Sequence, residues 1–177
     1  MFKVGETGFG KNNNAMNDVM RRVFTDRVIF SIRDKTGSPI SFAGRIYKDG
    51  DERRKWENGL TTSIFRKGQV LYGLDQARSY AFNNDKLYIV EGYTDTIRMH
   101  IHGHTNTVGI MFSQITEDQV LEIKKLGINR VVIALDKDPE ESKTKSKAFT
   151  SGLKLMEHNL EVYVKSIPKV GHDPDSY

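Results

Sequence analysis

The sequence contains no cysteine and no apolar run of membrane-spanning length. Without cysteine the chain can form no disulfide, use no thiolate for catalysis and offer no thiolate ligand to zinc. Its first residues lack the apolar core of a secretory signal peptide, and no stretch approaches the roughly 20 apolar residues that cross a bilayer. These absences predict a cytoplasmic protein with no membrane partner.

The composition is polar and modestly basic. The 177 residues suffice for one domain or two small ones. Hydrophobic residues make up 37% and charged residues 28%, which is typical of a globular protein. The formal net charge of +4 suits a polyanionic partner such as nucleic acid, although many proteins of this charge bind none.

Two apolar runs in the second half of the chain end on carboxylates. Leu87–Val90 leads into Glu91, and Val131–Leu135 leads into Asp136 and Asp138. Strands alternate with helices around these runs, which predicts a parallel sheet covered by helices. Because ligands bind outside the carboxyl ends of parallel strands, we expect the three acids at one edge of one sheet.

These carboxylates, with the acidic pair Asp173 and Asp175 near the end of the sequence, predict a divalent metal site. Like charges about 4 Å apart repel by several kcal/mol at an intermediate dielectric unless a proton or a cation neutralises them. Carboxylate oxygens suit Mg²⁺ or Mn²⁺, which serve phosphoryl transfer. Glu91 could instead be a general base toward an attacking hydroxyl. Helix capping or simple solvation of each acid is the alternative interpretation.

The pattern divides the sequence into three parts. Glycine and asparagine dominate residues 1–15, which predicts a flexible N-terminal segment. Residues 16–85 combine a helix, an apolar hairpin and a strongly charged stretch, which predicts a small basic α+β subdomain. Residues 86–177 carry the alternating strands and helices of the α/β domain.

Two helices of the α/β part have distinct signatures. Thr116 and Gln119 have the spacing of a capping box at the start of a helix over residues 116–126. A second helix, expected over residues 142–159, aligns three large apolar side chains on one face. The pattern predicts that these side chains lie in the core and form no partner surface: Phe149, Leu153 and Met156.

Three acidic motifs in order carry a specific resemblance. They are Glu91-Gly92-Tyr93-Thr94-Asp95, Asp136-Lys137-Asp138 and Asp173-Pro174-Asp175. Together they resemble the Toprim fold and, more narrowly, the catalytic core of bacterial and phage DnaG-type DNA primases. The similarity runs from about Val23 to the C-terminus, because three earlier stretches match the basic subdomain of that core: Phe24–Asp34, Phe42–Arg45 and Phe65–Leu74.

The resemblance implies a role for individual positions. Glu91 would be the catalytic acid. Four aspartates would hold Mg²⁺ or Mn²⁺: Asp136, Asp138, Asp173 and Asp175. Basic and polar positions would face phosphates of the template or the incoming nucleotide: Arg45, Lys55, Asn58 and Lys67.

The implied activity is template-directed synthesis of short RNA primers from ribonucleoside triphosphates on single-stranded DNA. Two alternatives stay open, namely a metal-dependent Toprim nuclease and a truncated nucleic-acid-binding or helicase-associated module without activity. The usual zinc-binding template-recognition module needs cysteine, and no helicase-binding bundle follows the motifs. We therefore expect a fragment or a reduced core, whose partner is a replicative helicase or a separate zinc-binding chain.

One detail departs from the pattern of the primase family, and the role of one residue stays open. The glycine-containing turn expected near Met111 is replaced by Phe112 and Ser113. Trp56 stands among cations in the charged stretch, where it either stacks on a base of a single strand or anchors a loop.

Overall fold

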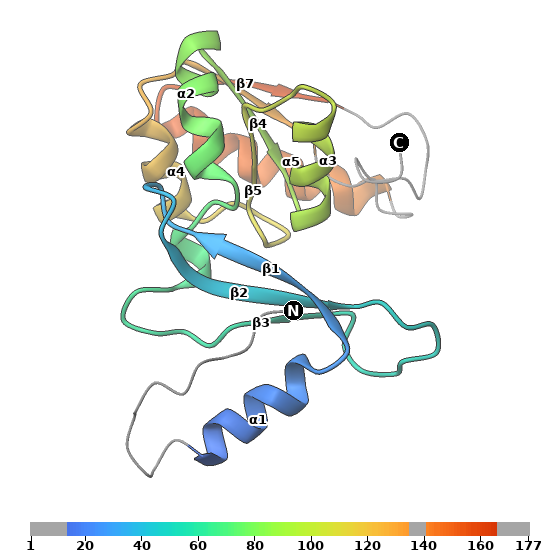
Figure 1. Cartoon of the computed structure of the whole chain (residues 1–177). Helices are drawn as coiled ribbons and strands as arrows, with labels where there is room; N and C mark the ends of the chain where they lie inside the picture. The colour runs from blue at the N-terminus through green and yellow to red at the C-terminus, as the bar shows by residue number, and fades with distance from the viewer. Residues whose placement is uncertain (1–13, 135–140, 166–177) are drawn as a thin grey trace. The chain divides into compact units, whose positions relative to one another are not determined.

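The computed structural model describes residues 14–134 and 141–165, and the chain divides into two compact units (Figure 1). The first unit comprises Met1–Phe30 and Phe42–Gly59, and the second comprises Ser31–Ser41 and Leu60–Tyr177. The tip of the first hairpin therefore belongs to the second unit. Among the described residues, no helix is both long and apolar enough to span a membrane.

The first unit contains a helix and most of a three-stranded sheet, and the tip of the hairpin formed by the first two strands belongs to the second unit. The sheet has the order β1-β2-β3, and β2 pairs with β3 in antiparallel fashion. The strand β3 was not predicted, because three residues between charged stretches carry no alternating pattern. The elements are α1 (Asn14–Phe24), β1 (Arg27–Arg33), β2 (Pro39–Ile46) and β3 (Trp56–Asn58).

Gly44 allows the end of α1 to pack against β2. A Cβ at this position would lie 2.8 Å from the Cδ1 atom of Phe24 and 3.0 Å from Cδ of Arg27. The Phe24 ring also meets the Phe42 ring, with 4.7 Å between the centroids. Successive side chains of a strand point to opposite faces of the sheet. Arg45 therefore points to the face opposite Phe24.

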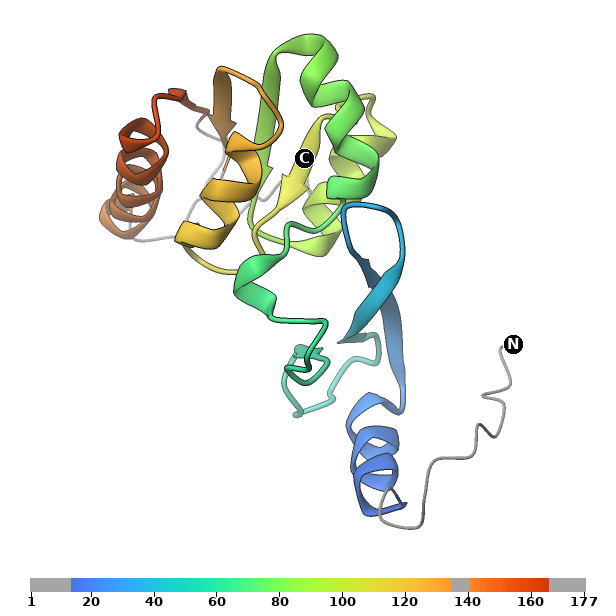
Figure 2. The same cartoon turned by 90° about the vertical axis from the view of Figure 1, so that its left-hand side faces the viewer.

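A parallel sheet flanked by helices builds the second unit, which confirms the expected α/β fold (Figure 2). The strand order is β5-β4-β6-β7, so β4 and β6 are the inner strands. The seven elements from β4 to β7 follow from the alternating pattern, α2 lies before that pattern begins, and the short η1 was not predicted. In chain order they are η1 (Lys67–Gln69), α2 (Leu74–Asn84), β4 (Lys86–Val90), α3 (Tyr93–Ile101), β5 (Thr107–Gly109), α4 (Glu117–Lys124), β6 (Arg130–Ile133), α5 (Glu141–Glu157) and β7 (Glu161–Val164).

The core of the second unit lies around the inner strands. Leu87, Ile89 and Val90 of β4 are at most 1% exposed. Burying an aliphatic side chain of this size contributes about 1.5–3 kcal/mol. The sheet residues pack with buried residues from three helices: Ala77 and Ala81 of α2, Val120 and Ile123 of α4, and Ala148 and Leu155 of α5.

The turn of the β1–β2 hairpin lies beside α2 in both views (Figures 1 and 2). Arg78 donates from Nη1 to the Lys35 carbonyl oxygen at 3.3 Å. The Lys35 Nζ lies 3.8 Å from Oε2 of Glu122. The turn itself is closed as the sequence predicted, with the Asp34 amide donating to the Ser38 carbonyl at 2.9 Å.

The prediction for the apolar face of α5 was wrong. Phe149, Leu153 and Met156 are 66%, 44% and 58% exposed. Ala148 and Leu155 face the core instead, and a Cβ on the buried Gly152 would lie 3.6 Å from Val162, at an ordinary contact distance. The 3.6-residue period marks two stripes on this helix, and the pattern alone does not tell which of them meets the sheet.

Candidate functional site

Glu91 directly follows β4, at the carboxyl edge of the parallel sheet where the sequence predicted it. Its Oε1 atom is buried, although the residue as a whole is partly exposed. Its carbonyl oxygen accepts a hydrogen bond from the Met111 amide at 2.8 Å. In open parallel sheets this edge is where ligands bind.

Backbone segments approach each other closely next to Glu91. The Gly92 amide donates to Oδ2 of Asp95 at 3.0 Å, and Oγ1 of Thr96 donates to the Gly92 carbonyl at 2.8 Å. A Cβ on Gly92 would lie 2.6 Å from that carboxylate oxygen, and a Cβ on Gly109 would lie 2.8 Å from the Gly92 carbonyl oxygen. Only glycine fits at either position, so the turn after Glu91 has little freedom.

Asp95 has a positioning role that the sequence analysis did not assign. The residue is 4% exposed and stands in the first turn of α3, three positions after the N-cap Gly92. A carboxylate there accepts from the cap amide and interacts favourably with the helix dipole. The spacing of the motif, a glycine followed three residues later by aspartate, was the available signal.

The four predicted metal-binding aspartates, Asp136, Asp138, Asp173 and Asp175, lie outside the described residues. The chain just after β6 stays paired with the inner strand β4, because the Ala134 amide donates to the Ile89 carbonyl at 2.9 Å. Within the described ranges, no group of three or more histidine, aspartate or glutamate side chains could hold a metal ion.

Lys67 opens η1 in the second unit and is half-buried. Its Nζ lies 4.6 Å from the centroid of the Phe112 ring. Burial lowers the pKa of the Lys67 ammonium group from its ordinary value. The next carbonyl, that of Gly68, accepts from Oγ1 of Thr116 at 2.5 Å, which joins η1 to the start of α4. The Thr116 capping box is confirmed, since its Oγ1 also accepts from the Gln119 amide at 3.2 Å.

The turn that lacks the expected glycine is formed by Met111. Its φ of 60° lies in the left-handed region, which costs a non-glycine residue roughly 1–2 kcal/mol. Met111 is 7% exposed, and its amide is the group that bonds to Glu91.

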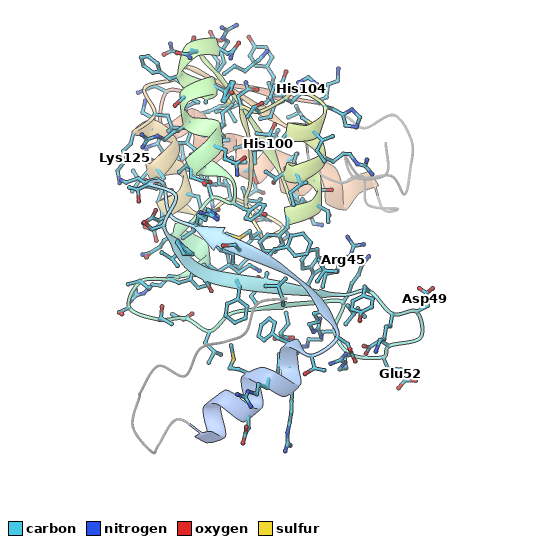
Figure 3. All side chains as sticks on the ribbon, viewed as in Figure 1. Arg45, Asp49, Glu52, His100, His104 and Lys125 are labelled. Carbon is cyan, nitrogen blue, oxygen red and sulfur yellow. The ribbon has the colours of Figure 1, made fainter. Side chains whose placement is uncertain are left out.

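Three of the predicted nucleic-acid-binding residues belong to the first unit. In the β2–β3 ladder Arg45 stands opposite Trp56, and Ala43 stands opposite Asn58. Because cross-strand partners share a face, Arg45, Trp56 and Asn58 lie on one face of the sheet (Figure 3 shows Arg45 on β2). Lys55 precedes β3 and is exposed. Lys67, the fourth predicted residue, belongs to the other unit.

Arg27 is a structural residue of the first unit to which the sequence pattern assigned no role. It is 9% exposed and donates from Nε to the Val23 carbonyl at 2.8 Å. Its Nη1 donates to the carbonyls of Gly44 and Lys55, each at 3.2 Å. One guanidinium thus joins α1, β2 and the start of β3.

The parallel sheet, with a strand-end glutamate followed by glycine and a capping aspartate, defines a protein of the Toprim class. Residues 85–164 match the family described as "Toprim domain", and residues 3–78 match "DNA primase catalytic core, N-terminal domain". The chain belongs to the family of DnaG-type primase catalytic cores.

Individual relatives agree with this family. The DNA primase of Deinococcus radiodurans is 36% identical over 152 residues, which cover 85% of this chain and 25% of that protein. The structure of Aquifex aeolicus primase (zinc binding and RNA polymerase domains) is 31% identical with a TM-score of 0.76, and the match covers 86% of this chain and 36% of that one. A DnaG primase catalytic domain bound to ssDNA is 29% identical with a TM-score of 0.71, over 85% and 47%. The chain spans about a quarter of the length of the curated relatives it matches.

Proposed function

We propose that the chain is a catalytic core of a DNA primase, which joins ribonucleoside triphosphates into short RNA primers on single-stranded DNA. The observation that carries the proposal is the position of Glu91, at the carboxyl edge of the sheet in a chain of the DnaG family. A relative of known structure is bound to ssDNA, and that relative supports the choice of template.

In the proposed reaction Glu91 acts as the general base. Its carboxylate takes the proton of the primer 3′-hydroxyl while that oxygen bonds to the α-phosphorus and pyrophosphate leaves. The hydrogen bonds of Gly92 with Asp95 and Thr96 constrain the backbone that follows Glu91, which limits where its side chain can start from. Preorganisation of this kind is what phosphoryl transfer mainly requires of a protein.

The proposed metal ligands are Asp136, Asp138, Asp173 and Asp175. Ile89 of the strand before Glu91 pairs with Ile133, and Asp136 follows Ile133 by three positions in the sequence. Carboxylate oxygens fit Mg²⁺ or Mn²⁺ better than softer metals. When bound, the ions would neutralise charge on the triphosphate and on the oxygens that attack and leave.

The proposed contacts with template and nucleotide phosphates are Arg45, Lys55, Asn58 and Lys67. Cations bind the single-strand backbone without reading its sequence, and the affinity then falls with salt. We also propose the boundaries 16–85 and 86–177 for the basic and Toprim parts, a cytoplasmic location, and a helicase or a zinc-binding chain as partner.

Primer synthesis on a single-stranded template with labelled ribonucleotides and Mg²⁺ or Mn²⁺ tests the function. Glu91→Gln should abolish synthesis and leave the thermal unfolding and the template affinity nearly unchanged. Glu157→Gln, at an exposed position of α5, is the matched control and should stay active. Full activity of Glu91→Gln would refute the assignment, and metal-dependent degradation of the template without synthesis would favour a nuclease.

A further inference from the structure

The contact between Arg45 and Trp56 has a consequence for template binding. The Cζ atom of Arg45 lies over the Trp56 ring, 5.5 Å from its centroid, which is within the range of a cation–π interaction. We infer that Trp56 is a positioning residue, whose ring holds the Arg45 guanidinium ready for a phosphate of the template strand. The inference rests on the proposed function, because it takes Arg45 as a phosphate contact.

The Trp56 ring is held from its own sheet. The Phe30 ring lies 5.0 Å from it between centroids, at an angle of 53°. Trp56 begins β3, and the residue before it is fixed by its carbonyl oxygen, which accepts from the Ile46 amide at 3.1 Å and from Nη1 of Arg27 at 3.2 Å. The backbone that carries Trp56 is therefore held by hydrogen bonds, and the Trp56 ring packs beside the Phe30 ring.

The backbone of Arg45 is equally fixed. Gly44 sits against Phe24 and Arg27 on the opposite face, and Arg45 pairs with Trp56 in the ladder. Arg45 has a long side chain, and ordering such a side chain costs conformational entropy when it binds. An aromatic ring under the guanidinium reduces that cost before the template arrives.

The chemistry of a guanidinium favours a phosphate as the ligand. A guanidinium carries its N–H donors in one plane, so a ring over its face leaves the donors at its edge to a ligand. Those in-plane donors bind phosphate oxygens in a bidentate manner. Trp56 thus acts through Arg45, and direct stacking of a base on Trp56 is the competing interpretation of the same side chain.

A salt series of template affinities tests the inference. The binding of a labelled oligo(dT) to the full chain is followed by fluorescence anisotropy for Arg45→Ala, Trp56→Leu, Trp56→Phe and the double variant. Arg45→Ala should lower the slope of log Kd against log salt by about 0.7, the value for one phosphate of a single strand. Trp56→Leu should lower the slope in the same direction and weaken binding about two- to fivefold, whereas Trp56→Phe should restore most of both.

The double variant separates the two interpretations. If Trp56 acts through Arg45, the double variant binds no more weakly than Arg45→Ala. A full additional loss would overturn the inference, because Trp56 would then bind the template by itself. Tyr47→Leu is the matched control: it removes another aromatic ring with a cation beside it, Lys48 at 5.9 Å, and should leave the slope unchanged.

The failure of the inference can be told from the failure of the proposed function. An unchanged slope for Arg45→Ala removes Arg45 from the phosphate contacts, and both fail for this residue. A lowered slope for Arg45→Ala with an unchanged slope for Trp56→Leu overturns the inference alone. If Trp56→Leu does not fold, the fluorescence of Trp56, the single tryptophan of the sequence, decides: oligo(dT) should change it in the wild type and not in Arg45→Ala. An equal change in both would overturn the inference.

Discussion

Replacement of Gln119 by methionine should both destabilise the second unit and lower the rate of primer synthesis. The Gln119 side chain is fully buried, and its Nε2 donates to the carbonyls of Val70 at 2.8 Å and Ile110 at 2.9 Å. Its Oε1 accepts from the Thr116 amide at 3.1 Å. Methionine has nearly the same length, so Gln119→Met removes these three hydrogen bonds while it fills the same space.

The expected loss follows from the groups left behind. A buried polar group without a partner costs about 1–3 kcal/mol, and two carbonyls lose their donor in this variant. The Thr116 amide at the helix start is partly buried, so water offsets some of its loss. We expect a decrease of about 2–4 kcal/mol in the free energy of unfolding, a large part of the roughly 5–15 kcal/mol of an ordinary domain.

The same variant should lower activity beyond its effect on stability. Val70 follows η1, which contains Lys67, and Ile110 precedes Met111, whose amide bonds to Glu91. Without Gln119 both segments lose their hydrogen bond to α4, so Lys67 and the Glu91 backbone are held less firmly.

Urea unfolding followed by circular dichroism measures the stability, and primer synthesis at a temperature where the variant is folded measures the activity. Asp118→Asn, at the exposed neighbouring position, is the control and should change the unfolding free energy by less than about 0.5 kcal/mol. A loss below about 1 kcal/mol for Gln119→Met would refute the reasoning, since the buried bond to the Ile110 carbonyl should by itself cost about that much when its donor is removed.

Three further predictions concern charge, packing and metal. Because burial lowers the pKa of Lys67, its charge should be lost as the pH rises through a value below 10.5, and the template affinity that depends on this charge should fall. Lys67→Arg should keep that affinity at high pH, as Kd values from about pH 7 to 10 would show. Between the lowered pKa and 10.5 the unfolded chain binds more protons, so the wild-type protein should gain stability with rising pH, and a flat profile would contradict this sign. Thermal unfolding should show Gly44→Ala destabilised by about 1–3 kcal/mol, because its Cβ would lie 2.8 Å from Phe24. Gly152→Ala should be stabilised by about 0.5–1 kcal/mol, because the atom nearest to its Cβ would lie at 3.6 Å. Equal effects of the two substitutions would argue against the packing at Gly44. If the proposed basic contacts carry the binding, EDTA should stop synthesis and leave oligo(dT) binding largely intact. Loss of both would link the metal to template affinity.

Local patterns were sufficient for most of the second unit. The apolar run before Glu91 predicted a buried strand, and β4 is one. The spacing of Thr116 and Gln119 predicted the start of α4. Such features depend on residues within one turn or one strand, so the sequence carries them directly.

Contacts between distant residues could not be predicted in the same way. The long-range bonds of Gln119 reach Val70 across 49 positions, and those of Arg27 reach Lys55 across 28. β3 exists because its three residues pair with β2, and no periodicity of its own announces it. The exposed side of α5 was misjudged for the same reason, since the neighbour that selects a helix face lies elsewhere in the chain.

The edge around Glu91 combines both kinds of information. A glycine was expected near Met111, yet the chain places a methionine there with a φ of 60° and accepts its strain. Strain of this kind persists only where neighbouring contacts determine the backbone, and two such contacts flank the turn: Gln119 bonds to the Ile110 carbonyl, and the Met111 amide bonds to Glu91. The sequence could therefore locate Glu91 by the strand that precedes it. The bonds that hold this edge in place come from Gln119 of α4 and from the Glu91 carbonyl just after β4, and the folded chain was needed to find them.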